Sequence, residues 1–385
     1  MITYQNLLKQ VPQPGAVMYF DWFLAEIVGF TRLEETPQDA YYHAEGNCLI
    51  HTKMVVAELV NGADYANSTD AERFVLFYAA LLHDISKPDT TVIDTVTGKI
   101  GQPGHSRRGA IDSRILLWRA GVPFALREAI CRIISVHQLP FFAIAGNKGG
   151  KSAEFLIRKL SHELDLRLLA AVAEADMRGR HYEKKADCLV DIELFREMAR
   201  DEDCYGKPRA FADAHTRLAY FRGAGISPDY AHHQEPGSPV IVLAGLPASG
   251  KDTRAAKIAN GRTVLSFDDA RKKLKVKHGS NAAGAAVHMV TDQARELLRR
   301  REPFIWNATH ISVLLRSKTL SLLFDYHAEV EIQYLEQPKD VLFGRNTKRD
   351  TTLTNMAIED MLLRWEVPLP TEAHSVEYLI GKQGN

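Results

Sequence analysis

The sequence has few cysteines, no net charge and no long apolar run. Its four cysteines form no CxxC pair, which is typical of reduced thiols in a cytosolic protein and gives no sign of a disulfide scaffold or zinc ribbon. The 48 basic and 48 acidic residues cancel, so contact with nucleic acid would need a local groove. No stretch approaches the roughly 18 apolar residues of a membrane span, and no signal-peptide pattern is present. We expect a cytoplasmic protein without a membrane partner.

Length and patterning predict two domains. With 385 residues, 45% of them hydrophobic, the chain can bury more than one core. From Ala71 to about Tyr220 the apolar residues recur at helical spacing, whereas the C-terminal part alternates short β-rich runs with helices. Residues 222–239 are rich in Gly and Pro and lack periodicity, which is typical of a linker. We predict an all-α domain over 1–237 and an α/β domain with a central parallel sheet over 238–385.

A phosphate-binding loop opens the predicted α/β domain. The stretch VIVLAGLPASGKDT runs from a buried strand into a helix, which is the context that a P-loop requires. Main-chain N–H groups and Lys251 would hold the phosphates of a nucleoside triphosphate, ATP or GTP. Asp252 stands where such loops carry Ser or Thr, so either Asp252 or Thr253 would serve Mg²⁺, and we favour Asp252. The predicted nucleotide-binding residues are Gly245, Ser249, Gly250, Lys251, Asp252 and Thr253.

Two further groups in this half predict phosphoryl transfer. In SFDDARKKL, Asp268 follows the second strand and could accept a proton from an attacking hydroxyl. Arg271, one helical turn further on, could hold a phosphate of the acceptor. In RNTKR, Arg345 and Arg349 are four residues apart, on one face of an expected helix, where they could neutralise charge on the transferring phosphoryl group.

The DDxR box followed far downstream by RNTKR resembles the 5'-hydroxyl polynucleotide kinase family, which includes a bacteriophage enzyme. The resemblance implies that Asp268 is the general base and that Arg271 binds the 3'-phosphate of the acceptor. It also implies that Arg345 and Arg349 grip the donor. Asn307 departs from the usual pattern, since many P-loop enzymes place a metal-binding Asp there.

Histidines and acids recur through the helical half. In LLHDISKP the adjacent His83 and Asp84 lie within an apolar helical pattern, and this pair is unusual to bury without a cation. Imidazole and carboxylate together suit Mn²⁺, Co²⁺, Ni²⁺ or Zn²⁺. Lys87, one turn beyond Asp84, could hold a phosphate oxygen. The candidate metal ligands are His51, His83, Asp84, His105, His137 and Asp176.

The order H…HD…H…H…D resembles the HD superfamily of metal-dependent phosphohydrolases. Over roughly residues 40–200, the boxes HT.MV, HD..K, GH...GA and EADxRGR resemble the HD domain of bacterial CCA-adding enzymes. The resemblance implies hydrolysis of 2',3'-cyclic phosphates and 2'-phosphates on RNA ends. By the family pattern a first metal is held by His51, His83, Asp84 and Asp176, and His105 with His137 could complete a second. Further candidates for phosphate contact are Arg107, Arg108, Arg178 and Arg180, and those expected to border the site are His43 and Glu45.

Together the two halves resemble the HD-domain polynucleotide kinase family of bacterial RNA repair. That resemblance implies a bifunctional end-healing enzyme, which phosphorylates 5'-OH ends and removes 2',3'-cyclic phosphate, 2'-phosphate or 3'-phosphate with one or two divalent metal ions. Its partners would be RNA or DNA ends and a separate polynucleotide ligase. Two alternatives remain open at this point: a small-molecule kinase fused to an HD nucleotidase, and a nucleotide-sensing regulator.

Overall fold

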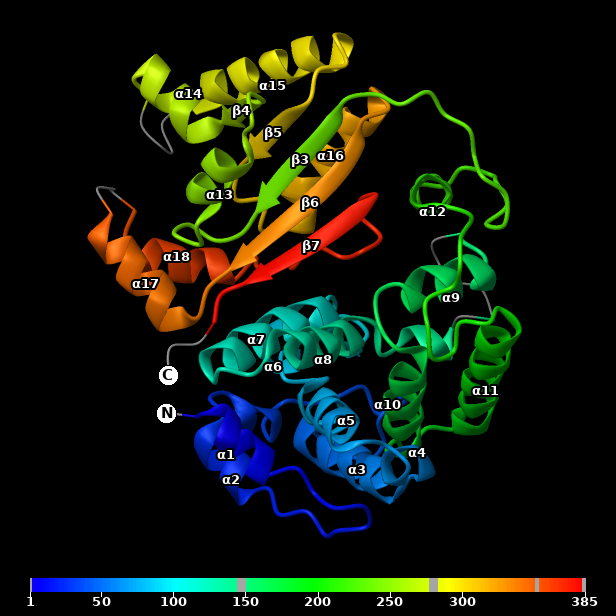
Figure 1. The fold of residues 1–385 in the computed structure, drawn as a ribbon. Helices are drawn as coiled ribbons and strands as arrows, with labels where there is room; N and C mark the ends of the chain where they lie inside the picture. Colours follow the sequence, from blue (N-terminus) through cyan, green and yellow to red (C-terminus); the bar gives the residue numbers. More distant parts are fainter. Residues whose placement is uncertain (1, 143, 145–149, 277–282, 350–352, 383–385) are drawn as a thin grey trace. The chain divides into compact units, whose positions relative to one another are not determined.

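The chain divides into two compact units, Met1–Arg209 and Ala210–Asn385, and each is described by itself (Figure 1). The structure is a computed structural model that describes residues 2–142, 144, 150–276, 283–349 and 353–382. Among these residues, no helix has both the length and the apolar character needed to cross a bilayer.

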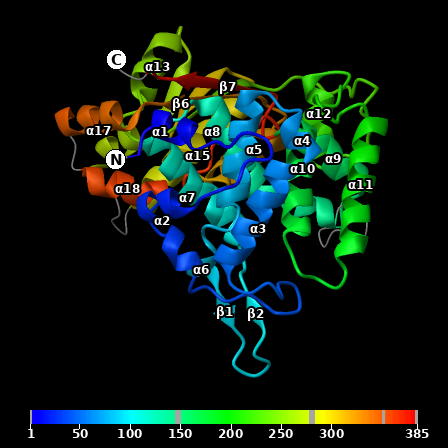
Figure 2. The same ribbon diagram turned by 90° about the horizontal axis from the view of Figure 1, so that it is seen from below.

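The first unit is built almost entirely from helices, as the sequence predicts. Its helices are α1 (Tyr4–Lys9), α2 (Asp21–Glu26), α3 (Cys48–Asn61), α4 (Ala63–Ala66), α5 (Asp70–Leu82), α6 (Lys87–Thr90), α7 (His105–Arg119), α8 (Phe124–Val136), α9 (Ala153–Ser161), α10 (Leu166–Arg178) and α11 (Lys185–Asp201). Two 3₁₀ turns cover Phe30–Leu33 and Leu139–Phe141. The short strands β1 (Val92–Ile93) and β2 (Ile100–Gly101) pair in an antiparallel hairpin that extends away from the helices (Figure 2).

Helix α5 is the centre of this unit. It begins at a capping box, in which Thr69 and Glu72 satisfy each other's main-chain N–H groups. Its residues 74–82 are all buried, and a helix that is apolar on every side must be covered on every side. Helices α3, α8 and α10 pack against it. The end of α5, where His83 and Asp84 follow, therefore lies in the interior.

The second unit contains a five-stranded parallel sheet, which confirms the predicted fold class. Its strands are β3 (Pro239–Ala244), β4 (Thr263–Ser266), β5 (Phe304–Asn307), β6 (Glu329–Glu336) and β7 (Ser375–Ile380), in the order β4-β5-β3-β6-β7. Its helices are α12 (Ala214–Phe221), α13 (Lys251–Ile258), α14 (Phe267–Leu274), α15 (Ala283–Arg299), α16 (Val313–Asp325), α17 (Lys339–Lys348) and α18 (Asn355–Leu362). The edge strand β7 was not predicted from the sequence.

The strand order places β3 in the middle of the sheet, between β5 and β6. In register, Val240 of β3 faces Phe304 of β5 on one side and Val330 of β6 on the other. In open parallel sheets, ligands bind beyond the carboxyl ends of the strands where the strand order reverses. The loop between β3 and α13 lies at this point (Figure 1).

The segment before β3 differs from the expected linker. The units divide after Arg209, whereas the sequence analysis placed the boundary near Gly237. Helix α12 belongs to the second unit and contacts the segment that precedes β7, because Arg217 Nη2 donates to the main-chain oxygens of Ala373 (3.1 Å) and His374 (2.7 Å). Its C-cap Arg222 lies over the ring of Phe324, 4.5 Å from the centroid. Gly and Pro residues here shape an ordered connection, and whether the activities also divide at this point stays a prediction.

A truncation tests where the second unit begins. We expect residues 210–385 to unfold at a higher temperature than residues 238–385, because the shorter chain lacks α12. Hydrogen bonds to a charged donor contribute about 1.5–3 kcal/mol each, and about 2–4 °C of melting temperature corresponds to each kcal/mol in a domain of this size. The two hydrogen bonds of Arg217 together contribute about 3–6 kcal/mol, so a loss of about 6–24 °C is expected in a thermal melt. Equal melting temperatures would instead support the boundary at Gly237.

Candidate functional site

The six predicted metal ligands meet inside the first unit. His51 lies on α3, His83 and Asp84 follow α5, and His105 is the first residue of α7. The remaining two are His137, which caps α8, and Asp176 on α10. All six side chains are buried. Residues distant in sequence thus converge because the helices that carry them pack around α5.

The same kind of contact sets the tautomer of each of the four histidines. Nδ1 lies close to a main-chain oxygen in each of the four: 2.7 Å from Ala80 O for His83, 2.8 Å from Ile134 O for His137, 2.7 Å from Gln102 O for His105 and 3.2 Å from Gly179 O for His51. A carbonyl only accepts hydrogen bonds, so Nδ1 must carry the proton. In the neutral ring Nε2 then has a free lone pair, which is the form of imidazole that binds a metal.

The Nε2 atoms face one another and two carboxylates. His51 Nε2 lies 3.3 Å from His83 Nε2 and 3.0 Å from Asp176 Oδ1. Asp84 lies between the histidines, with Oδ2 3.0 Å from His83 Nε2 and Oδ1 3.5 Å from His105 Nε2. These atoms form two groups that could each hold a metal ion: His51, His83 and Asp176 make the first, and Asp84, His105 and His137 the second. Asp84 belongs to the second group, and its Oδ2 also lies 3.0 Å from His83 Nε2 and 3.7 Å from His51 Nε2 of the first.

Electrostatics keep Asp84 and Asp176 charged and His105 and His137 neutral. Burial lowers the pKa of His137 to about 3, and burial also lowers the pKa of His105. Burial alone would raise the pKa of Asp84, but nearby His83 and Lys87 hold that pKa well below its usual range. For His83, burial lowers the pKa but the adjacent Asp84 carboxylate raises it by more, so the pKa of His83 is raised overall. Ionised carboxylates and neutral imidazoles are the protonation states that metal binding requires.

A divalent ion fits this set of donors. Among the described residues, His137 Nε2 and both carboxylate oxygens of Asp84 are buried without a hydrogen-bond partner. Lys87 Nζ approaches Asp84 Oδ2 at 2.8 Å, but the contact is electrostatic and lacks hydrogen-bonding direction. Buried acceptors without donors are costly. Nitrogen and oxygen ligands in this mixture suit transition metals.

Glu45 stands behind His51 and orients it. Glu45 Oε1 lies 3.0 Å from His51 Nδ1 and 2.8 Å from His43 Nδ1, while Oε2 accepts from the main-chain N–H of His181 at 2.9 Å. These contacts outweigh burial and lower the pKa of the Glu45 carboxyl. A carboxylate on the second nitrogen of a ligating histidine fixes the ring and raises its basicity. The sequence placed Glu45 only at the border of the site.

The cations around the cluster differ in part from those expected. Lys87 is buried beside Asp84, and its Nζ donates to Gln38 Oε1 at 2.6 Å. Arg180 is also buried, and Arg180 Nη2 reaches both oxygens of Asp176 at 2.7 Å. Arg108 instead pairs with Asp112, and Arg178 with Glu174 at the surface. Arg107 is exposed on α7.

The P-loop of the second unit has the backbone that its glycines allow. Gly245 has a φ of 144°, and a Cβ there would overlap the main-chain oxygen of Leu335. Gly250, with a φ of 104°, is the N-cap of α13. Lys251 Nζ is buried inside the loop and donates to Gly245 O (2.9 Å) and Leu246 O (2.8 Å). The loop therefore holds an ammonium group at the start of a helix, where anions bind.

Asp252 and Asn307 form a pair across the site. Asn307, at the end of β5, donates from Nδ2 to Asp252 Oδ1 at 2.8 Å. P-loop enzymes usually hold Mg²⁺ with a loop hydroxyl and a strand-end Asp. Here the carboxylate is on the loop side and the neutral amide is on the strand, which is the reverse of the usual arrangement. The exposed Thr253 has no comparable contact among the described residues.

The predicted general base and the predicted lid also border this loop. Asp268, in the first turn of α14, forms an ion pair with Arg271. Arg349 Nη2 lies 3.4 Å from Asp252 Oδ2, and Arg345 approaches Gly250. The expectation that both arginines share a helix is wrong, because α17 ends at Lys348 and Arg349 has an extended backbone.

The charges of this site act together on Lys251. Burial lowers the pKa of Lys251 to about 8. Asp252 and Asp268 act in the opposite direction, whereas Arg349 lowers the pKa further. Asp252, Asp268 and Arg349 therefore all lie close enough to Lys251 to interact with its charge.

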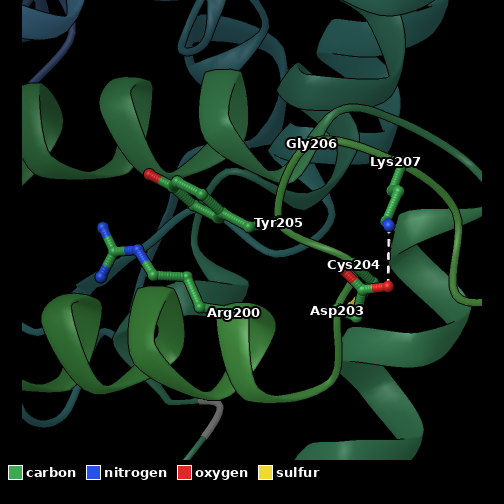
Figure 3. A pocket seen from close by; sticks show the side chains of 6 residues that line it. All are labelled: Arg200, Asp203, Cys204, Tyr205, Gly206 and Lys207. Atoms are coloured by element: carbon green, nitrogen blue, oxygen red, sulfur yellow. Dashed lines mark ion pairs between the residues drawn. The ribbon is translucent and has the colours of Figure 1, made fainter.

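The first unit also has a surface pocket. It is at the end of α11 and is lined by Arg200, Asp203, Cys204, Tyr205, Gly206 and Lys207 (Figure 3). Lys207 Nζ pairs with Asp203 Oδ2 at 2.7 Å. None of the predicted site residues lines this pocket.

Comparisons with known proteins assign the second unit. Residues 240–368 match the family described as an AAA domain, so this unit contains a P-loop nucleotide-binding domain. A solved structure of a Chloroflexus aurantiacus protein, provisionally assigned as a kinase, is similar with 19% identity and a TM-score of 0.32. The similarity covers 37% of this chain and 88% of that one, and it is too low to support a functional inference. No curated protein matches the chain.

Glu45→Gln tests the carboxylate behind His51. The substitution keeps the shape of the side chain but removes its charge, so the ring loses its best acceptor. We expect a 10- to 100-fold weaker affinity for Mn²⁺, measured by calorimetric titration of the metal-free protein. The control is Glu35→Gln, at an exposed position of the same unit. Unchanged affinity in Glu45→Gln would show that Glu45 does not position His51.

An exchange of residues tests the Asp252–Asn307 pair. Asp252→Asn should raise the Mg²⁺ concentration needed for binding of a fluorescent nucleoside triphosphate, because the carboxylate is lost. Adding Asn307→Asp should restore part of the Mg²⁺ dependence by returning an acid to the strand end. Thr253→Ala should have a smaller effect than Asp252→Asn. The reverse ranking would assign the metal to Thr253.

Proposed function

We propose that the protein heals both ends of a broken polynucleotide strand. The second unit would transfer a phosphoryl group from a nucleoside triphosphate to a 5'-OH end. The first unit would remove a 2',3'-cyclic phosphate, a 2'-phosphate or a 3'-phosphate from the other end. Cleavage that leaves these two ends produces a substrate that an ordinary ligase cannot join, so a separate ligase would act next.

The observation that carries this proposal is the coexistence of a P-loop and a buried cluster of histidines and carboxylates in one chain. One is a P-loop with Asp268 and Arg271 at the same end of the sheet. The other is a buried cluster of histidines and carboxylates beside Lys87 and Arg180. Both sites suit phosphate esters, and neither requires a large apolar pocket.

For phosphoryl transfer, the P-loop N–H groups and Lys251 bind the donor phosphates. Arg345 and Arg349 neutralise the charge on the transferring group. Arg271 pairs with Asp268, and an acceptor phosphate that takes over Arg271 would release the Asp268 carboxylate. Asp268 then accepts the proton of the attacking 5'-OH.

For phosphate removal, His51, His83, Asp176, Asp84, His105 and His137 would hold the divalent ions. When bound, such ions polarise a phosphate ester and generate a hydroxide from water near neutral pH. Lys87, held by Gln38, is placed to bind a phosphate oxygen. Arg180, which clamps Asp176, keeps that carboxylate oriented and adds positive charge for an anionic substrate.

Two single substitutions separate the proposed activities. Asp268→Asn should lower 5'-phosphorylation of a 5'-OH oligonucleotide by about 10² to 10⁴ and leave release of the 3'-end phosphate unchanged. Asp84→Ala should do the opposite, because it removes a metal ligand from the other unit. Matched controls at exposed acids are Asp269→Asn and Asp89→Ala.

The outcomes distinguish the proposal from its alternatives. Wild-type protein that phosphorylates mononucleosides but not oligonucleotides would point to a small-molecule kinase. Absence of turnover at both ends, in folded protein supplied with Mn²⁺ and Mg²⁺, would favour a nucleotide sensor. If Asp84→Ala also abolished phosphorylation in a protein with an unchanged thermal melt, the two units would be catalytically interdependent.

A further inference from the structure

Three tyrosines form a cluster on the first unit, and we refer to Tyr41, Tyr42 and Tyr182 as the tyrosine platform. The ring centroids of Tyr41 and Tyr42 are 4.8 Å apart. The centroid of Tyr182 lies 5.7 Å from that of Tyr41 and 5.5 Å from that of Tyr42. Tyr41 and Tyr42 are each 49% exposed. Tyr182 also packs against the small core around Phe141 and Met177. The platform is therefore anchored on one side and presents aromatic surface to solvent on the other.

One loop joins the platform to the metal-ligand cluster. Asp39 shapes this loop, because its oxygens accept the main-chain N–H groups of Tyr41, Tyr42 and His43. The His43 ring then packs edge-on against His51, 4.7 Å between centroids. Glu45 Oε1 contacts Nδ1 of both His43 and His51, and His51 is one of the candidate metal ligands.

The same loop is tied to the segment that carries Tyr182. The N–H of Ala44 donates to His181 O at 3.1 Å, and the N–H of His181 donates back to Glu45 Oε2 at 2.9 Å. His181 directly follows Arg180, which clamps Asp176. Tyr41 and Tyr42 thus lie a few residues before Glu45, and Tyr182 follows Arg180 closely in the chain. Both segments that carry the platform are therefore fixed next to the cluster.

The loop also offers a free polar donor. Gln38 Oε1 accepts from Lys87, but Gln38 Nε2 is buried and has no hydrogen-bond partner among the described residues. The side chain is 6% exposed, and a buried donor without an acceptor is destabilising. An oxygen-rich anion next to Lys87 would satisfy this amide. Anion-binding groups and an aromatic surface therefore occur on one loop.

We propose that the tyrosine platform stacks the last nucleobase of the strand whose terminal phosphate lies at the cluster. This inference rests on the proposed function and specifies its substrate as the unpaired end of a polynucleotide. Base stacking on aromatic side chains tolerates every sequence and increases affinity about ten- to hundredfold per base. The adjacent cations Lys87 and Arg180 favour a phosphate-bearing ligand over an uncharged protein surface.

Equilibrium binding and turnover test the platform with two oligonucleotides. Both carry a dye at the 5' end and a 3'-phosphate, but one lacks the base of its last nucleotide. In full-length protein, Tyr41→Ala and Tyr42→Ala should weaken binding of the complete strand about tenfold or more, measured by fluorescence anisotropy in the presence of a chelator. The abasic strand should bind wild type and variants equally, and Tyr→Phe should preserve binding because the ring remains.

The control substitution is Tyr19→Ala, at a 77% exposed tyrosine of the same unit. With metal restored, the Ala variants should raise KM for the complete strand while kcat changes little. Equal binding of both strands by wild type, or full affinity in Tyr41→Ala and Tyr42→Ala, would overturn the platform. If binding follows the platform but no phosphate is released, the platform stands and the proposed hydrolysis fails.

Discussion

The candidate metal site of the first unit depends on which ring nitrogen of each histidine carries the proton. Four main-chain oxygens accept from Nδ1, and three of them belong to residues three positions earlier in the chain. Helices α5 and α8 end at His83 and His137, where carbonyls have no intrahelical partner. The free carbonyls at these two helix ends thus set the tautomers of His83 and His137. The resulting Nε2 atoms converge on two ionised acids, an arrangement that could hold a metal ion.

The second unit depends on close approach of the P-loop to β6. Gly245 lies against the main chain of Leu335, which leaves no room for a side chain. This contact places Lys251 and the start of α13 over the carboxyl ends of the central strands. The loop departs from the usual pattern at Asp252, and Asn307 at the end of β5 departs as well. The two residues that depart from the pattern are hydrogen-bonded to each other.

Much of the fold and many site residues could be predicted from the sequence, because their signals are local. The P-loop follows its strand directly, and His83 and Asp84 lie in one helical pattern. Glu45 and Gln38 could not be assigned, because their partners His181 and Lys87 are distant in sequence and no periodicity links them. Residues 222–239 are predicted to be a linker because they are rich in Gly and Pro, but these residues are common both in linkers and in ordered connections. The roles of individual residues stay predictions.

The most direct measurement uses one RNA strand with a 5'-OH and a 2',3'-cyclic phosphate. The wild-type protein is incubated with this RNA, Mn²⁺, Mg²⁺ and either ATP or GTP, and both ends are analysed by mass spectrometry. The account predicts that the product gains a 5'-phosphate and loses its 3'-end phosphate to give free hydroxyls. An RNA that keeps its cyclic phosphate, or that remains unphosphorylated with both nucleotides, would contradict it.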